Sequence, residues 1–130
     1  MQEQINYYSD KLKYEIDSWD LSQSLSENKK LIVIDARSEE AFDTEHILSS
    51  INIPHRTMNE ETTKDLDKSY LYVTYCDGIG CNASTKGALK MAELGFEVKE
   101  LLGGLDWWKR DGCKTSNTSG INKNKTTCGC

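Results

Sequence analysis

The chain is most informative over residues 71–84, which read Leu71-Tyr72-Val73-Thr74-Tyr75-Cys76-Asp77-Gly78-Ile79-Gly80-Cys81-Asn82-Ala83-Ser84. The first five residues are rich in β-branched and aromatic types and predict a strand. A loop with two glycines follows, and an alanine-rich segment with the character of a helix comes next. Cys76 therefore stands where the strand ends, close to the loop amides and to the positive end of a helix dipole. Such surroundings favour a thiolate and stabilise a sulfur anion.

Strands and helices are expected to alternate along the rest of the chain. Asp17 or Ser18 is placed to cap the second helix, and Gly95 is placed to end the helix after the cysteine loop. Short connections between alternating elements predict an α/β domain with a mainly parallel sheet. Besides 71–75, the expected strands are 14–16, 31–34, 51–53 and 98–102. The expected helices lie at about 3–13, 18–25, 38–42 and 57–67; another follows the cysteine loop and runs to Leu94, and a last one follows Gly104.

The composition indicates one domain with two flanking segments. Residues 1–13 are predicted to be an N-terminal helical extension, because apolar residues recur there at helical spacing in a polar sequence. Residues 14–112 form the predicted domain. Residues 113–130 are rich in Ser, Thr, Asn, Gly and Lys, so we expect a flexible tail that carries cysteines.

The net charge and hydropathy of the chain indicate its compartment and the kinds of partner that it lacks. A formal net charge of -5 gives no broad attraction to nucleic acid or to an anionic membrane. No apolar run approaches the roughly 20 residues that span a bilayer, and the first residues lack the pattern of a signal peptide. We therefore expect a cytoplasmic protein with no nucleic-acid or membrane partner. In that reducing compartment its five cysteines indicate redox, sulfur or metal chemistry rather than a disulfide framework.

Several short motifs occur in a fixed order along the chain. They are Val33-Ile34-Asp35-Ala36-Arg37, His46-Ile47, Ile51-Asn52-Ile53-Pro54, Tyr75-Cys76, Ala92-Glu93-Leu94-Gly95-Phe96 and Gly103-Gly104-Leu105-Asp106-Trp107-Trp108. With these motifs the chain resembles, over about residues 14–112, the single-domain rhodanese-like sulfurtransferases. The resemblance implies a three-layer α/β/α fold with a five-stranded, mainly parallel sheet. It also implies an active-site cysteine directly after the fourth strand, a position that only Cys76 occupies.

The chain departs from the family pattern in its cysteine loop and near its His-Ile motif. The loop is about two residues longer than the commonest single-domain version, contains a second cysteine, Cys81, and lacks the Arg or Lys that often holds anionic donors. Glu45 and Ser49 replace glycines that are common around His46-Ile47. A phosphatase of similar architecture would need an arginine at the end of the loop to clamp an oxyanion, and Asn82 or a neighbour stands there instead.

The chemistry implied is transfer of a sulfane sulfur. The Cys76 thiolate takes sulfur from a thiosulfate- or persulfide-type donor, holds it as a persulfide, and passes it to a thiol or another nucleophile. The expected partners are thus a small sulfur donor and a thiol acceptor, or a partner protein as acceptor, with no cofactor and no metal. The alternative is that Cys76 is only a small buried hydrophobic residue at a strand end.

The substrate-binding loop is predicted to comprise Asp77, Gly78, Ile79, Gly80, Asn82, Ala83 and Ser84, with Gly78 and Gly80 allowing its amides to converge.

The remaining cysteines leave alternatives open. Cys81 either attacks a Cys76 persulfide or sulfenate, as a resolving or relay group, or only fills space. Cys128 and Cys130 either reach the loop as sulfur acceptors, bind a soft metal together with a partner, or belong to an unremarkable terminus. The alternative function is a low-turnover persulfide or soft-metal carrier that uses Cys76, Cys81 and the Cys128/Cys130 tail.

Polar side chains near other strand ends have structural interpretations. Asp35 is expected to cap the following helix, and Arg37 to pair with Glu39, Glu40 or Asp43. His46 is expected to hydrogen-bond nearby backbone rather than to act as a general base.

Overall fold

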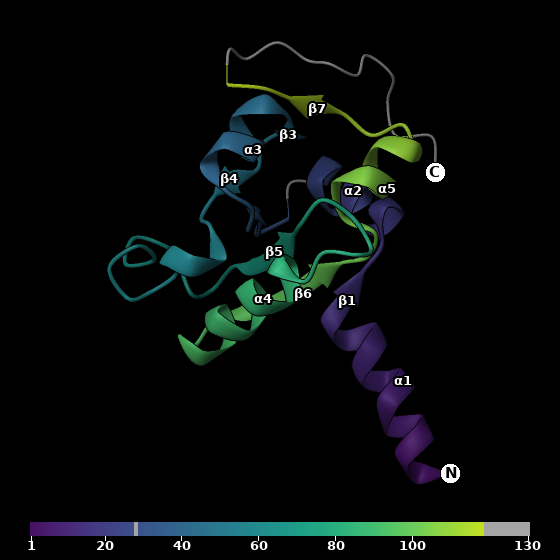
Figure 1. Ribbon diagram of the computed structural model, residues 1–130. Helices are drawn as coiled ribbons and strands as arrows, with labels where there is room; N and C mark the ends of the chain where they lie inside the picture. Colours follow the sequence, from purple (N-terminus) through teal and green to yellow (C-terminus); the bar gives the residue numbers. More distant parts are fainter. Residues whose placement is uncertain (28, 119–130) are drawn as a thin grey trace.

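The computed structural model describes residues 1–27 and 29–118. Its elements alternate as expected for an α/β domain (Figure 1). In chain order they are α1 (Gln2–Tyr14), β1 (Glu15–Ile16), α2 (Ser18–Ser26), β2 (Leu31–Asp35), α3 (Glu39–Thr44), β3 (His46–Ile47), β4 (Ile51–Asn52), the 3₁₀ helix η1 (His55–Thr57), β5 (Leu71–Tyr75), α4 (Ala83–Glu93), β6 (Glu97–Leu101), α5 (Gly104–Arg110) and β7 (Thr115–Ser116).

Five strands form one sheet in the order β1-β6-β5-β2-β4, and every neighbouring pair is parallel. The predicted fold class is therefore confirmed. β2 pairs with β5 from Leu31–Leu71 to Asp35–Tyr75, so the carboxyl ends of these two strands are level. Arg37, two residues beyond β2, and Cys76, the residue after β5, consequently lie at the same edge of the sheet, where α/β proteins form their sites.

The sheet is buried between two helical layers (Figure 1). On one face, Val33 and Val73 pack with Leu21 of α2 and Trp108 of α5. On the opposite face, a second cluster includes Met91 of α4. The continuous apolar sequences of β2 and β5 follow from this arrangement, because successive side chains of each strand enter opposite layers.

Local sequence signals explain where α2 begins and where α4 ends. Asp17 caps α2 by accepting a hydrogen bond from Asp20 N at 2.8 Å. Gly95, with φ +93°, follows α4 in the left-handed conformation that glycine favours. Gly95 N donates to Ala92 O and Phe96 N to Met91 O, the two bonds of a Schellman motif.

Helix α1 extends away from the sheet, and none of its residues is buried (Figure 1). Among the described residues, no helix combines the length and the apolar character required to cross a bilayer.

Residues 59–66, the strand β3 and the start of the C-terminal tail differ from the sequence-based expectation, and β3 was not among the expected strands. Residues 59–66 form turns rather than the helix expected at 57–67. Asn59 Oδ1 accepts from Thr62 N, and Thr62 Oγ1 accepts from Asn59 N and donates to Thr57 O at 2.7 Å. These side chains satisfy the backbone locally, and so they compete with helical hydrogen bonds.

The start of the expected flexible tail at 113–130 is also ordered. Thr115 and Ser116 form β7, which pairs antiparallel with His46 and Ile47 of β3. Both residues are buried, and Thr115 Oγ1 donates to Glu45 Oε2 at 2.8 Å. Backbone pairing and burial therefore offset the polar composition that suggested a tail at this point, whereas residues 119–130 lie outside the described part of the chain.

Candidate active site at the cysteine loop

Cys76 follows β5 directly, and the next helix holds its backbone in place. Leu105 N donates to Cys76 O at 2.9 Å, and Asp106 N donates to Asp77 O at 2.8 Å. The first amides of a helix have no partner within the helix. Those of α5 use the two carbonyls at the start of the cysteine loop instead, which fixes where the loop leaves the sheet.

Gly104 allows this close approach. Its φ is +58°, and a Cβ at this position would overlap Cys76 O and approach Gly78 N to 2.8 Å. Gly78 and Gly80 were expected to bend the loop so that its amides converge. Neither of them is among the described glycines with a positive φ, so the loop does not need glycine at these two positions for that reason. A Cβ on Gly80 would meet no atom of the described residues within 4 Å. The glycines that the backbone requires are therefore Gly103, at φ +77°, and Gly104, at the start of α5.

Cys76 and Cys81 are joined by a disulfide, with their Cα atoms 6.1 Å apart. Between them the loop closes on itself through a hydrogen bond from Cys81 N to Gly78 O at 3.2 Å. The pairing brings the second cysteine of the loop into direct contact with the first, which the sequence left open.

The two sulfur-bearing residues differ in their surroundings. Cys76 is 2% exposed, yet neither hydrophobic cluster of the described residues includes it. Cys81 is partly exposed and lines a cavity of about 610 Å³ together with Gly80, Asn82 and Leu102. Ile79, at the tip of the loop, is 83% exposed. A reagent that enters from solvent through this cavity thus meets Cys81 first.

Helix α4 begins at the other end of the loop. Asn82 is its N-cap residue, and the Asn82 side chain makes no capping hydrogen bond among the described residues. The hydroxyls of Ser84 and Thr85 donate to Glu100 Oε2 at 3.1 and 2.6 Å, which ties the first turn of α4 to β6. The start of this helix therefore contributes a positive dipole beside the loop.

The predicted binding loop thus divides into parts with different environments. Asp77, Ile79, Gly80 and Asn82 are exposed, Gly78 and Ala83 are partly exposed, and Ser84 is buried. Gly78, Ile79, Gly80, Asn82 and Ser84 all line the 610 Å³ cavity. The loop consequently presents a solvent-facing tip between two anchored ends.

The charged groups that line this cavity are acidic. They are Glu15 and Glu100, and no Lys or Arg is among the described lining residues. Glu15 pairs with Lys11 at 2.9 Å, whereas Glu100 accepts only hydroxyl hydrogen bonds among the contacts described. A multiply charged anion is therefore poorly accommodated in the cavity.

Arg37 links the end of β2 to the cysteine loop. Its guanidinium donates to both carboxylate oxygens of Asp35, at 2.7 to 3.1 Å, and its Nη1 donates to Asp77 Oδ1 at 2.8 Å. Burial alone lowers the pKa of Arg37, but the hydrogen bonds and charge of Asp35, with Asp77 adding to them, raise this pKa above its ordinary value. Arg37 thus remains charged at the rim of the loop.

The expected partners of Asp35 and Arg37 were wrong. Ser38, not Asp35, caps α3, because Ser38 Oγ accepts from Ala41 N at 3.2 Å. Asp35 is fully buried and also accepts from Tyr75 Oη at 2.7 Å. A buried carboxylate is costly unless it is paired and hydrogen-bonded. Asp35 therefore keeps Arg37 as its ion-pair partner, and Arg37 does not pair with the exposed acidic residues of α3.

Tyr75, the last residue of β5, completes this buried network. Its hydroxyl accepts from Ile47 N at 3.0 Å and lies 3.1 Å from Ser50 Oγ. Burial, and then the charge of Asp35, raise the pKa of Tyr75 well above its usual range. Tyr75 is therefore a neutral hydrogen-bonding group that positions the strand end.

His46 has the structural role expected of it. Its Nδ1 lies 2.6 Å from Phe42 O, and its ring stacks on that of Phe42 with centroids 3.7 Å apart. The residue is buried, and it pairs with Ser116 of β7.

The predicted tail acceptors Cys128 and Cys130 lie outside the described residues. Within residues 1–27 and 29–118, no group of three or more His, Cys, Asp or Glu side chains is arranged to hold a metal ion. A soft-metal site made only from the described residues therefore finds no support.

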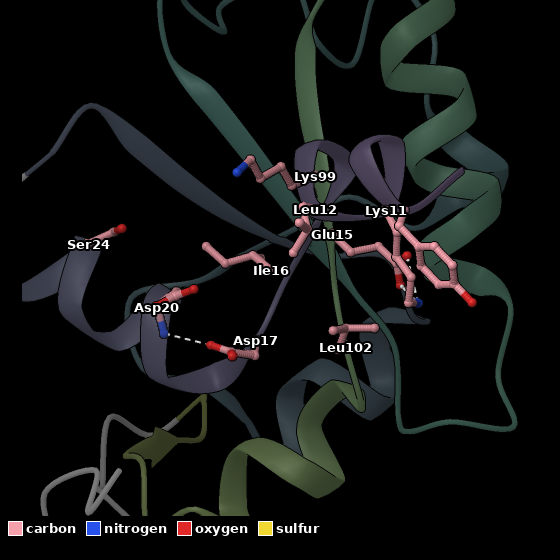
Figure 2. Close-up of a pocket in the computed structure, with 10 residues that line it drawn as sticks. Lys11, Leu12, Glu15, Ile16, Asp17, Asp20, Ser24, Lys99 and Leu102 are labelled. Carbon is pink, nitrogen blue, oxygen red and sulfur yellow. Dashed lines mark hydrogen bonds and ion pairs between the residues drawn. The ribbon is translucent and has the colours of Figure 1, made fainter. Parts of the chain in front are cut away.

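A second hollow lies between α1, α2, the edge strand β1 and its neighbour β6 (Figure 2). It has a volume of about 430 Å³, and its lining includes Leu12, Ile16 and Leu102. Glu15 and Leu102 also line the cavity beside Cys81, so the two hollows adjoin.

The fold and the loop together define a three-layer α/β/α protein with a sulfur site at the carboxyl edge of its parallel sheet. The sequence model of the family described as Rhodanese-like domain matches residues 18–111. The chain therefore belongs to the rhodanese-like family, which confirms the resemblance noted in the sequence and supports a place among the sulfurtransferases.

Known proteins show the same relationship. The chain is 29% identical over 111 residues to the thiosulfate sulfurtransferase GlpE of Coxiella burnetii, covering 84% of this chain and 92% of that protein. It is 42% identical to the BH2092 protein from Bacillus halodurans, whose crystal structure matches with a TM-score of 0.86 over 92% of this chain and 88% of that one. It is 25% identical to a rhodanese-like domain from Anabaena sp., with a TM-score of 0.71 over 79% of this chain and 78% of that one.

Proposed function

We propose that the protein transfers a sulfane sulfur through a persulfide on Cys76. The observation that carries this proposal is the position of Cys76, which directly follows the central strand β5 and is bonded to Cys81, a partly exposed residue that lines the cavity at the loop. A cysteine that serves only as a small hydrophobe has no such partner beside a cavity. The first turn of α4 and the loop amides supply the dipoles that favour a thiolate at this place.

The transfer proceeds in two displacements. The Cys76 thiolate attacks the outer sulfur of a donor persulfide, the bond between the two donor sulfurs breaks, and the donor thiolate leaves. An acceptor thiolate then attacks the outer sulfur of the Cys76 persulfide, and Cys76 leaves as a thiolate. Because the observed disulfide occupies the Cys76 sulfur, it must be reduced before the first displacement.

The charges around the loop favour a persulfide-type donor over thiosulfate. The cavity is lined by Glu15 and Glu100, and Asp77 already engages Arg37, the guanidinium at the rim of the loop. Thiosulfate carries two negative charges, and every close carboxylate opposes its entry. A thiol-derived persulfide carries less charge at the reacting sulfur and is less affected.

A comparison of donors tests this proposal. The full chain is reduced, freed of reductant, and assayed for sulfur transfer to a small thiol with glutathione persulfide or thiosulfate as donor. We expect turnover that is faster with glutathione persulfide, and its loss in Cys76→Ser. Equal turnover by Cys76→Ser contradicts the proposal. Loading of sulfur on Cys76 without turnover on either donor supports the low-turnover carrier instead.

A further inference from the structure

We propose that Cys81 resolves the Cys76 persulfide, so that the protein releases the transferred sulfur as hydrosulfide and is left with the Cys76–Cys81 disulfide. This inference rests on the proposed persulfide at Cys76 and adds a reductive activity to it. It assigns the second loop cysteine a catalytic role, and it makes an external dithiol the second substrate.

The disulfide itself shows which sulfur Cys81 can reach. The Sγ atoms of Cys76 and Cys81 are bonded to each other, and their Cα separation of 6.1 Å lies within the ordinary range for a disulfide. In a persulfide, the Cys76 Sγ is the inner sulfur. Attack there by Cys81 breaks the bond to the outer sulfur and expels it, whereas attack on the outer sulfur would relay it to Cys81. The bonded geometry favours the resolving reaction.

Both ends of the loop are held while this reaction takes place. Cys76 and Asp77 are fixed by amides of α5 at 2.9 and 2.8 Å, and the loop closes through Cys81 N to Gly78 O. At the far end, Thr74 Oγ1 donates to Ser84 O at 2.9 Å, which ties the start of α4 to β5. Only a short, solvent-facing tip lies between these anchors, so the two sulfurs stay near each other whether bonded or not.

The start of α4 also supports Cys81 as a nucleophile. Cys81 immediately precedes the N-cap Asn82, and the helix runs for eleven residues from Ala83. The positive end of its dipole favours the thiolate that must attack. Hydrosulfide is itself anionic, and the two carboxylates that line the cavity favour its departure.

The overall reaction balances in sulfur and in electrons. The Cys81 thiolate donates the electron pair that forms the new bond to Cys76 Sγ, and the outer sulfur leaves with its bonding pair as HS⁻. The two cysteines are thereby oxidised and the sulfane sulfur is reduced. A dithiol reductant restores both thiols and becomes a disulfide.

The exposure of the two sulfur-bearing residues determines how the reductant attacks. Cys81 lines the cavity, whereas Cys76 is 2% exposed. The external thiolate therefore attacks the Cys81 sulfur and forms a mixed disulfide there, and Cys76 leaves as a thiolate. This order returns Cys76 to its reactive form while the reductant is still attached to Cys81.

A single-turnover experiment without reductant tests the inference. The reduced full chain and Cys81→Ser each receive one equivalent of glutathione persulfide, and free sulfide and intact protein mass are measured over time. The wild type should release close to one equivalent of sulfide and lose the mass of two hydrogen atoms, with a Cys76–Cys81 cross-link in its peptide map. Cys81→Ser should gain the mass of one sulfur atom and release sulfide only when a thiol is added.

The outcomes separate this inference from the proposed function. Stable retention of the added sulfur by both proteins overturns the resolving role but leaves the persulfide in place. Absence of any added sulfur in Cys81→Ser contradicts the persulfide itself. Replacing Cys128 and Cys130 by serine in one further variant separates the tail from the loop, and loss of sulfide release in that variant, with Cys81 intact, also overturns the inference.

Discussion

Arg37 Nη1 lies 2.8 Å from Asp77 Oδ1, so the residue that follows Cys76 is tied to a side chain just beyond β2. The same guanidinium binds the fully buried carboxylate of Asp35 and donates to Glu45 O at 2.6 Å. One arginine thereby holds three segments at the carboxyl edge of the sheet. Its main contribution is to position the loop, because its donors are occupied by protein acceptors.

Replacing Arg37 by Met should destabilise the protein strongly. The substitution leaves the Asp35 carboxylate buried without its cationic partner, and the loss of one member of such a pair costs about 3–5 kcal/mol. Urea unfolding followed by circular dichroism measures the change in the free energy of unfolding. The matched control is Arg110→Met, because Arg110 pairs with Asp106 at the surface and should contribute less than about 1 kcal/mol. Similar losses in the two variants contradict the assigned role.

Gly104→Ala should disturb the cysteine loop and lower stability. The left-handed φ of +58° alone costs a residue with a Cβ about 1–2 kcal/mol, and overlap with Cys76 O adds to that. Gly80→Ala is the control, since a Cβ there meets no atom within 4 Å in the part of the chain that the structure describes, and Gly80 is not one of the glycines with a positive φ. Unfolding midpoints of the two variants should differ clearly, and equal midpoints argue against close packing of α5 on the loop.

Ser49→Gly should stabilise the protein. Ser49 has a φ of +72°, the one positive value found at a non-glycine residue in the described part of the chain. Glycine removes the strain of this conformation, a gain of about 1 kcal/mol after its larger entropy in the unfolded chain is subtracted. Ser69→Gly is the control, because Ser69 is also exposed in a turn but has an ordinary φ; it should lower stability slightly. A lower melting temperature for Ser49→Gly contradicts the prediction.

Stability should fall in mild acid partly because of His55. Burial, and then the charges of Lys86, Lys90 and Arg56, lower the pKa of His55 in the folded chain. The unfolded chain therefore binds more protons once the pH falls below about 6.5, and the folded state loses stability through that range. We expect His55→Gln to lose less stability than the wild type between about pH 7.5 and pH 5.5. An identical loss in both proteins, measured by urea unfolding, contradicts the assignment.

The sheet was predictable because its signals are local. The continuous apolar runs of β2 and β5 require burial on both faces, and Gly95 requires a left-handed residue at the end of α4. The position of Cys76 followed from the end of β5. The short edge strands β1 and β4 were also predicted, because Asp17 follows the first and Pro54 closes the second.

The contacts that build the site were not predictable in the same way. The Arg37–Asp77 pair joins residues 40 positions apart, whereas the carboxylates of α3 lie much nearer to Arg37 in the sequence. The burial of Asp35, which keeps Arg37 beside it, is what places the guanidinium near Asp77. β7 was missed because Thr115 and Ser116 carry no apolar signal, and their burial depends on β3 and Glu45. The pairing of Cys76 with Cys81 depended on how the loop folds between its two anchors.

Locating the added sulfur atom by peptide mapping tests the central claim most directly. Reduced Cys81→Ser, in which the persulfide cannot be resolved within the loop, is treated with one equivalent of glutathione persulfide, trapped with an alkylating reagent and digested. The extra sulfur atom should be found on the peptide that contains Cys76, and Cys76→Ser treated in parallel should carry none. Finding the sulfur on Cys113 or on the tail cysteines, with Cys76 unmodified, contradicts the account.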